Sequence, residues 1–250
     1  MRLRIQAVRL VLAAVAVTSV VSACAGGAPS TGAAATTGGV TGGAEASASP
    51  GPPTAQRAVS LHGALVVHRS AAAASAVAAR LPASTPLGSP RVLLVRSVVP
   101  GWVQVDLPTR PNGSSGWVAA ADVRVETVDD QITVDLASRR LTLVIGGKTL
   151  ATTPVAVGST SNPTPTGRFY VTDRVSPTDP GGSYGVFALG LSAHSATLSE
   201  FGSGDGQIGI HGTNAPDSIG KAVSHGCVRV PDDVARMLES VPLGTPVVIS

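Results

Sequence analysis

The sequence contains few aromatic residues, few charged residues and only two cysteines. Aromatic residues make up 3% of the 250 residues, so a folded core must be built from Val, Leu, Ile and Ala. Charged residues make up 13%, and the formal net charge of +3 falls to zero without Arg2, Arg4 and Arg9. The remaining Lys and Arg residues form no cluster that would match a phosphate backbone. We therefore expect no nucleic-acid partner.

Residues 1–23 have the organisation of a targeting segment. Three arginines precede an apolar run from Leu10 to Val21, which is shorter than the roughly 20 residues that a membrane-spanning helix needs. A basic stretch, an apolar stretch and then small residues are typical of a signal peptide. We expect this segment to direct export.

The first cysteine lies directly after this segment. The run Val21-Ser22-Ala23-Cys24 resembles a bacterial lipobox, which implies lipidation of Cys24 before cleavage. The alternative is an ordinary small-residue cleavage site beside an incidental cysteine. Lipidation predicts a protein of the cell envelope, anchored to the outer face of the cytoplasmic membrane. More than one acyl chain makes such anchoring stable.

Residues 24–56 differ in composition from everything that follows. They consist mainly of Ala, Gly, Ser, Thr and Pro, with Glu45 as the only charged residue. Such a segment cannot bury enough apolar surface to offset the entropy cost of ordering. We therefore predict a lipidated, disordered tether that gives a folded part reach from the membrane.

Residues 57–126 contain short apolar runs separated by Pro and Gly turns, which predicts a small β domain. The runs are residues 65–67, 92–95, 102–105 and 116–118. This pattern is similar to bacterial SH3-like wall domains. For Trp102 and Trp117 the prediction is core filling, and the alternative is a sugar- or peptide-binding face.

Residues 127–250 predict a β-meander that ends in a short helix. Apolar and polar residues alternate over 131–136, and Gly146-Gly147 closes a tight hairpin. Pro231 opens the helix, and acidic residues follow it in the first turn. Four apolar residues at helical spacing are expected to form the buried face: Val234, Met237, Leu238 and Val241.

The second cysteine lies in the stretch that holds the most candidate catalytic residues, Ile210 to Arg229. A thiol is mostly protonated at neutral pH, so a nucleophilic Cys227 needs a nearby base. His225 lies two residues before it, on the same face if the chain is extended. His211 lies further back, at a predicted strand end, and can approach the thiol across neighbouring strands. Both histidines are candidates for the base.

These motifs resemble the L,D-transpeptidase catalytic domain, the YkuD-type fold. The resemblance rests on His211-Gly-Thr, on Ser-His-Gly-Cys-Val-Arg at residues 224–229, and on Pro-Thr-Pro-Thr-Gly at residues 163–167. It covers roughly Asp129 to Ser250. The fold class it implies is mainly β: a small SH3-like β domain followed by a YkuD-type β-sandwich catalytic domain with a short C-terminal helix.

The resemblance also implies roles for individual residues. Cys227 is the implied acyl-accepting nucleophile and His211 the implied proton shuttle. Three residues are implied to shape the turn and the oxyanion hole: Ser224, His225 and Gly226. Four are implied to contact substrate: Tyr184, Gly212, Thr213 and Arg229. Some family members have Asn where this sequence has Arg229. No cofactor is implied.

The implied function is cross-linking of peptidoglycan stem peptides, both donor and acceptor, through a cysteine thioester, by a protein expected to be a monomer. The alternatives are an L,D-carboxypeptidase or other cysteine hydrolase of the wall, and a wall-binding lipoprotein without activity. Papain-like peptidases place the cysteine before the histidine, whereas His211 precedes Cys227 here. Zinc is a further alternative, but the histidines lack a second cysteine or close His pair, so no metal is expected.

Overall fold

The computed structural model describes residues 54–200 and 204–250. From Thr54 onward the described chain belongs to one compact unit. The predicted signal peptide, Cys24 and most of the predicted tether lie outside the described residues. The first strand begins at Ala55, within the last residues of the predicted tether. No described helix combines the length and apolar character needed to cross a membrane.

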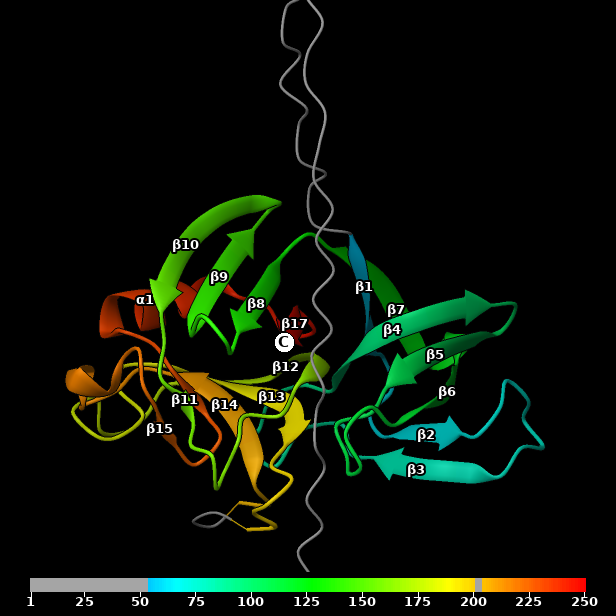
Figure 1. The fold of residues 1–250 in the computed structure, drawn as a ribbon. Coiled ribbons are helices and arrows are strands. Elements are labelled where there is room, and N and C mark those ends of the chain that lie inside the picture. Colours follow the sequence, from blue (N-terminus) through cyan, green and yellow to red (C-terminus); the bar gives the residue numbers. More distant parts are fainter. Residues whose placement is uncertain (1–53, 201–203) are drawn as a thin grey trace, which may run out of the picture. The chain divides into compact units, whose positions relative to one another are not determined.

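The first part of the chain forms a seven-stranded sheet in the order β3-β2-β6-β5-β4-β1-β7, and every pairing between its neighbours is antiparallel (Figure 1). A single 3-10 turn, η1 (Ala120–Asp122), precedes the last strand. The strands are β1 (Ala55–Ser60), β2 (Leu65–His68), β3 (Val77–Leu81), β4 (Val92–Val99), β5 (Trp102–Asp106), β6 (Ser115–Ala119) and β7 (Val123–Val128).

The core of this sheet contains neither tryptophan. It is built from leucines and valines such as Leu93, Val103 and Val118. On β5 and β6 the buried residues alternate with Trp102 and Trp117, which are only partly buried and therefore lie on the outer face. The Trp102 ring meets His68 edge to face, with ring centroids 5.2 Å apart. The core-filling prediction for the tryptophans is wrong, because alternation on these strands gives the inner positions to valines.

The second part of the chain forms an eight-stranded sheet in the order β10-β9-β8-β17-β12-β13-β14-β16. The pairs β8–β17 and β14–β16 are parallel, and the other neighbours are antiparallel. The strands are β8 (Gln131–Asp135), β9 (Arg140–Ile145), β10 (Lys148–Pro154), β12 (Gly167–Val175), β13 (Ala188–His194), β14 (Gln207–His211), β16 (Val228–Arg229) and β17 (Pro246–Ile249). The predicted hairpin at Gly146-Gly147 is confirmed, with β9 and β10 on either side.

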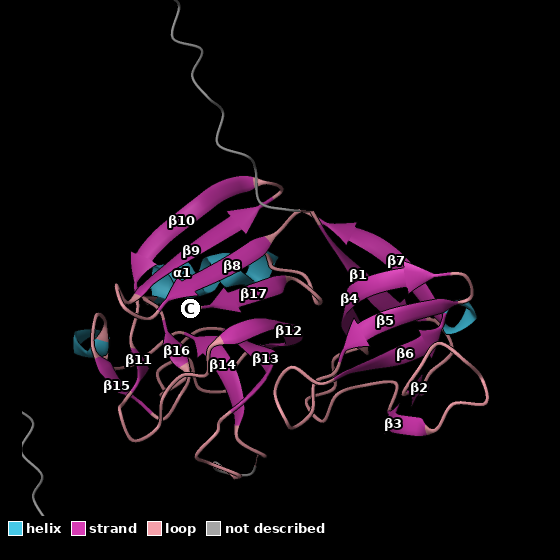
Figure 2. Ribbon diagram, turned by 45° about the vertical axis from the view of Figure 1, so that its right-hand side comes forward, coloured by secondary structure: helices cyan, strands magenta, loops and turns pink. Residues whose placement is uncertain are grey.

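The two halves of this sheet fold over one another in a sandwich-like arrangement (Figure 2). Strands β8, β9 and β17 and strands β12, β13 and β14 contribute to one hydrophobic core. A separate two-stranded parallel sheet pairs β11 (Val157–Gly158) with β15 (Ala222–Ser224). The mainly β, sandwich-like fold predicted from the sequence is confirmed.

The predicted short helix is α1 (Asp232–Met237), followed by the 3-10 turn η3 (Leu238–Ser240). Val234, Leu238 and Val241 are buried as predicted, but Met237 is 37% exposed. Ala235 takes the buried place instead. The prediction for Met237 is wrong: the residue ends α1 at the surface, and Ala235 and Leu238 occupy the buried positions around it.

Strand β12 contributes to both cores through two consecutive residues. Successive side chains of a strand point to opposite faces. Phe169 accordingly packs in the core of the eight-stranded sheet, whereas Tyr170 packs among the leucines and valines of the seven-stranded sheet. Tyr170 is fully buried, and its hydroxyl donates to the carbonyl oxygen of Asp106 at 3.2 Å. The two sheets therefore share one continuous packed region.

Thr245 carries a buried hydroxyl that has no hydrogen-bond partner among the described residues. The side chain is 0% exposed. An unsatisfied buried polar group costs about 1–3 kcal/mol, so we expect Thr245→Val to raise the free energy of unfolding by about 1 kcal/mol or more. Urea unfolding of both proteins measures this difference. Thr133→Val, which removes a partly exposed hydroxyl, is the control and should change it by less than about 0.5 kcal/mol. A less stable Thr245→Val protein would contradict the prediction.

Candidate active site

The site is built where β14 and β16 run parallel. Ile210 is paired with Val228, and His211 is paired with Arg229. Ile210 and Val228 are both fully buried in the core. Side chains alternate along a strand, so His211 and Cys227, each one residue away from this pair, lie on the opposite face of the sheet. The nucleophile and base candidates therefore face the same side of the sheet, with Cys227 two residues before Arg229, the register partner of His211.

The Cys227 sulfur lies against the backbone of β14. The N–H of Gly209 donates to the sulfur, with a nitrogen-to-sulfur distance of 3.4 Å. This contact confirms the register, because Gly209 lies two residues before His211 on the same strand face. A donated N–H also favours a thiolate over a thiol. Gly209 is a residue of the site that reasoning from the sequence missed.

The protonation state of the His211 ring follows from one contact. Its Nδ1 lies 2.6 Å from the carbonyl oxygen of Gly212. A carbonyl oxygen only accepts, so Nδ1 must carry the proton and donate it. In the neutral ring, Nε2 is then the unprotonated nitrogen. His211 is therefore held in the tautomer that a general base requires.

Burial determines the charge state of both groups. Burial lowers the pKa of His211 to about 4. The hydrogen bond to Gly212 raises this pKa by a smaller amount, and the charge of Arg229 lowers it further. Burial also raises the pKa of the Cys227 thiol, and the Gly209 N–H and Arg229 only partly offset this. The pair at rest is thus a thiol beside a neutral imidazole. A preformed thiolate-imidazolium pair, the state in which an imidazole has already ionised the sulfur, is disfavoured.

The buried His211 makes stability depend on pH. Its folded pKa of about 4 lies below the ordinary value of 6.5. The contribution of the neutral ring to the free energy of unfolding is therefore complete above pH 6.5 and is lost as pH falls toward 4. At about 1.4 kcal/mol per pKa unit, we expect a loss of roughly 3 kcal/mol over this window. Urea unfolding at pH 7 and pH 4 measures it. The His211→Gln protein should lose about 3 kcal/mol less than wild type, and equal losses would contradict the prediction.

Tyr184 lies over this pair. Its ring centroid is 4.9 Å from that of His211, at an interplanar angle of 60°. Burial raises the pKa of the Tyr184 phenol, and the negative charge of an ionised Cys227 raises it further. The side chain is nevertheless 46% exposed. Tyr184 thus contacts the histidine with one side and solvent with the other, which suits a substrate-contacting residue.

The turn before Cys227 is closed by its own hydrogen bonds. The Ser224 hydroxyl accepts the Gly226 N–H at 3.1 Å and donates to the Cys227 carbonyl at 2.6 Å. The Gly226 amide is therefore engaged within the turn and does not point at a substrate. The Cys227 N–H has no partner among the described residues, which makes it the better oxyanion donor. Gly226 has φ of +124°, so the turn is not extended, and the exposed His225 does not share the face of Cys227 as an extended chain would place it.

A second turn holds His211. Gly212 and Gly185 pack so closely that a Cβ on Gly212 would lie 3.1 Å from the Gly185 Cα. The Asp232 carboxylate, at the start of α1, accepts the N–H of Thr213 at 3.1 Å. Gly212 and the buried Thr213 thus contribute to positioning His211, with Gly212 supplying the carbonyl that fixes its tautomer. Asp232 was predicted only as a helix-terminal charge, because its contact with residue 213 is long-range.

Arg229 supplies the positive charge beside the site. Its position opposite His211 on the neighbouring strand lets the guanidinium lower the pKa of both His211 and Cys227. Its buried Nε has no hydrogen-bond partner among the described residues. A cation placed here favours negative charge on the sulfur or on an attacked carbonyl oxygen.

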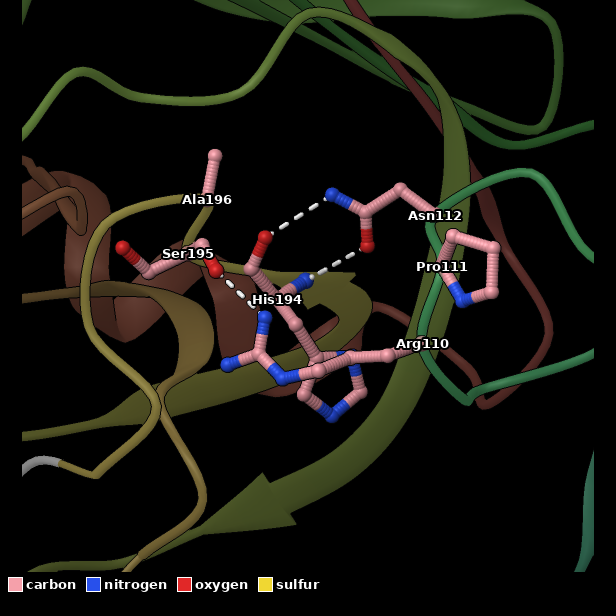
Figure 3. Close-up of a pocket in the computed structure, with 6 residues that line it drawn as sticks. All are labelled: Arg110, Pro111, Asn112, His194, Ser195 and Ala196. Carbon is pink, nitrogen blue, oxygen red and sulfur yellow. Dashed lines mark hydrogen bonds between the residues drawn. The ribbon is translucent and has the colours of Figure 1, made fainter.

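A separate pocket lies where the β5–β6 loop meets the end of β13 (Figure 3). Its volume is about 560 Å³. Asn112 bonds both the N–H and the carbonyl of His194, at 2.9 and 2.8 Å, and Arg110 donates to the Ser195 carbonyl. These contacts join the two sheets. None of the residues lining this pocket belongs to the Cys227 site.

The described residues offer no group of three His, Cys, Asp or Glu side chains arranged to hold a metal ion. Of the histidines, His194 lies 3.1 Å from the Asp205 carboxylate, away from Cys227, and His68 packs against Trp102. The chemistry that the site offers comes from the thiol, the imidazole and backbone amides. A nucleophilic cysteine with a neutral histidine base defines a cysteine acyl-transfer site.

Comparison with known proteins assigns the family. Residues 129–249 match the model of the L,D-transpeptidase catalytic domain. The YkuD protein of Bacillus subtilis is 36% identical over 151 residues, which cover 58% of this chain and 84% of that protein. The YkuD protein of Bacillus licheniformis is 36% identical over 155 residues, with 59% and 86% covered. An L,D-transpeptidase from Mycobacterium smegmatis superimposes with a TM-score of 0.40 at 17% identity, over 64% of this chain and 89% of that one.

The chain belongs to the L,D-transpeptidase family. It is an acyltransferase of that family, as the sequence motifs predict.

Proposed function

We propose that this protein cross-links peptidoglycan stem peptides through an acyl-enzyme on Cys227. The observation that supports this most directly is the fixed tautomer of His211, whose unprotonated Nε2 belongs to a ring on the same sheet face as the Cys227 sulfur. A neutral base beside a protonated thiol is the arrangement needed to make the nucleophile at the moment of attack.

Acylation proceeds by attack of the sulfur on a carbonyl carbon of the donor stem. The thiol proton passes to Nε2 of His211 as the carbon–sulfur bond forms. The carbonyl oxygen becomes an oxyanion, which the free Cys227 N–H and the Arg229 charge stabilise. His211 then returns the proton to the departing amine of a D-amino acid. A thioester and a free D-amino acid result.

The second half of the reaction regenerates the thiol. The amine of an acceptor stem attacks the thioester carbon and loses a proton to His211. The carbon–sulfur bond breaks, and the leaving sulfur takes that proton back from His211. Water in place of the amine gives a trimmed stem, which is the carboxypeptidase outcome. A tetrapeptide donor cut after the L-centre of its diamino acid is the substrate that the family resemblance implies. Tyr184, exposed and in contact with His211, is proposed to cover the donor.

We further propose that the protein acts as a monomer outside the cytoplasmic membrane, held by lipid on Cys24. The basic and apolar segment of residues 1–23 and the run Val21-Ser22-Ala23-Cys24 support this placement. Cell fractionation tests it. Wild type should remain with the membrane, whereas Cys24→Ala should appear in the soluble fraction.

The function is tested on purified protein with a disaccharide tetrapeptide as donor and acceptor. Mass spectrometry should show cross-linked dimers together with released D-amino acid. Trimmed monomers without dimers would identify a hydrolase instead. No product of either kind, from a folded protein, would contradict the proposal.

A further inference from the structure

We propose that Thr164 is a positioning residue for the oxyanion hole, because it fixes the peptide that carries the Cys227 amide. The inference rests on the proposed function and goes one step beyond it. Thr164 lies in the Pro-Thr-Pro-Thr-Gly run of residues 163–167, one of the motifs that carry the family resemblance.

The Thr164 hydroxyl has both of its hydrogen-bonding roles assigned. It donates to the carbonyl oxygen of Gly226 at 2.8 Å and accepts the N–H of Gly158, also at 2.8 Å. The carbonyl must accept and the amide must donate, so the hydroxyl proton can only point at Gly226. The side chain is 4% exposed. Solvent therefore does not compete for the Gly226 contact.

This contact sets the direction of the Cys227 N–H. The Gly226 carbonyl and the Cys227 N–H belong to one peptide unit, and in a trans peptide they point in opposite directions. With the carbonyl held by Thr164 on one side, the N–H must face the other side. That N–H has no partner among the described residues, and it belongs to the nucleophile itself. It is thus directed away from the protein contact and left available for the oxyanion.

Nothing else in the turn holds this carbonyl. Ser224 bonds the Gly226 N–H and the Cys227 carbonyl, which belong to the peptides on either side. Gly226 has φ of +124°, a region that glycine adopts without strain and leaves easily. Without the Thr164 contact, the Gly226–Cys227 peptide would be free to rotate about its two flanking bonds.

The loop that carries Thr164 is itself fixed to the turn. A Cβ on Gly158 would lie 2.3 Å from the Asn162 carbonyl oxygen and 2.4 Å from the Thr164 nitrogen, so the loop wraps tightly around this glycine. The Ser159 N–H donates to the Ser224 carbonyl at 2.9 Å. Strands β11 and β15 pair in parallel beside it. Thr164 and the catalytic turn therefore hold a common position.

The test compares two reactions of Cys227 in the full-length protein. Acylation by a carbapenem passes through an oxyanion, whereas alkylation by iodoacetamide displaces iodide and does not. In Thr164→Val we expect the maximal acylation rate to fall about 10- to 100-fold, less than the roughly 10²- to 10³-fold cost of removing an oxyanion donor, because the Cys227 N–H remains and only its support is lost. The alkylation rate should stay within about twofold of wild type, and the carbapenem concentration at half-maximal rate should change little. Thr164→Ser keeps the hydroxyl and should restore acylation to within a few fold.

Thr245→Val is the matched control, because it removes a buried threonine hydroxyl outside the turn and should leave both rates unchanged. An equal fall of acylation and alkylation in Thr164→Val would overturn the proposal, since the role would then be structural only. Unchanged acylation in that variant would also overturn it. Failure of wild type to react with the carbapenem would instead count against the proposed function, so the two failures are distinguishable.

Discussion

Replacement of Cys227 by alanine is expected to abolish acyl-enzyme formation, with a fall in the acylation rate of about 10⁴-fold or more. The thiol is the only group of the site that can form the thioester. The mass shift that a carbapenem produces on wild type should be absent from this variant. Its fold should persist, because the residue as a whole is not fully buried and its sulfur accepts a single weak hydrogen bond.

Two further substitutions sharpen this result. Cys24→Ala leaves Cys227 as the only cysteine of the chain, and it should react like wild type. Cys227→Ser should be as inactive as the alanine variant, because a histidine with a pKa of about 4 is too weak a base to activate a hydroxyl. A carbapenem adduct on Cys227→Ala would show that the nucleophile has been assigned wrongly.

Replacement of His211 by glutamine is expected to lower the acylation rate about 10²- to 10⁴-fold at neutral pH, the usual contribution of a general base. The side chain still offers an N–H for the Gly212 carbonyl, but nothing takes the thiol proton. The pH profile should change as well. Wild type should lose activity only as pH falls toward 4, where His211 becomes protonated. The variant should instead gain about tenfold per pH unit on the alkaline side, until the raised thiol pKa is passed.

The same profile decides between the two candidate bases. His225→Gln removes the rival imidazole, and His62→Gln removes an exposed histidine of the β1–β2 loop as a control. If His225→Gln shows the greater loss and the alkaline rise, then His225 is the base and the assignment of His211 is wrong. If only His211→Gln shows the loss of activity and the alkaline rise, then His211, in the tautomer fixed by Gly212, is the general base.

The sequence predicted the parts of the fold that depend on local pattern. Alternation and glycine turns predicted the β9–β10 hairpin, and Pro231 with its following acids predicted helix α1. Local pattern succeeded for both because each depends on neighbouring residues only. The roles of His211 and Cys227 rest instead on the family resemblance of their motifs, and they stay predictions.

What the sequence could not predict depends on contacts between distant segments. Asp232 bonds the turn after His211, and Thr164 bonds the turn before Cys227, across 19 and 62 residues respectively. The neutral state of the pair was also missed, because burial sets it and burial is a property of the assembled sheet. The two tryptophans are a different case, because the alternation along their own strands, a local pattern, already places them outside.

The position of Tyr170 limits how the chain can be shortened. Residues 129–249 suffice for the family match, yet a fragment cut there would expose the tyrosine ring that the preceding sheet encloses. The Asp173 carboxylate, which now accepts the Thr85 hydroxyl, would lose that donor. Anyone seeking a minimal soluble enzyme would first have to redesign this strand, with a polar residue at position 170.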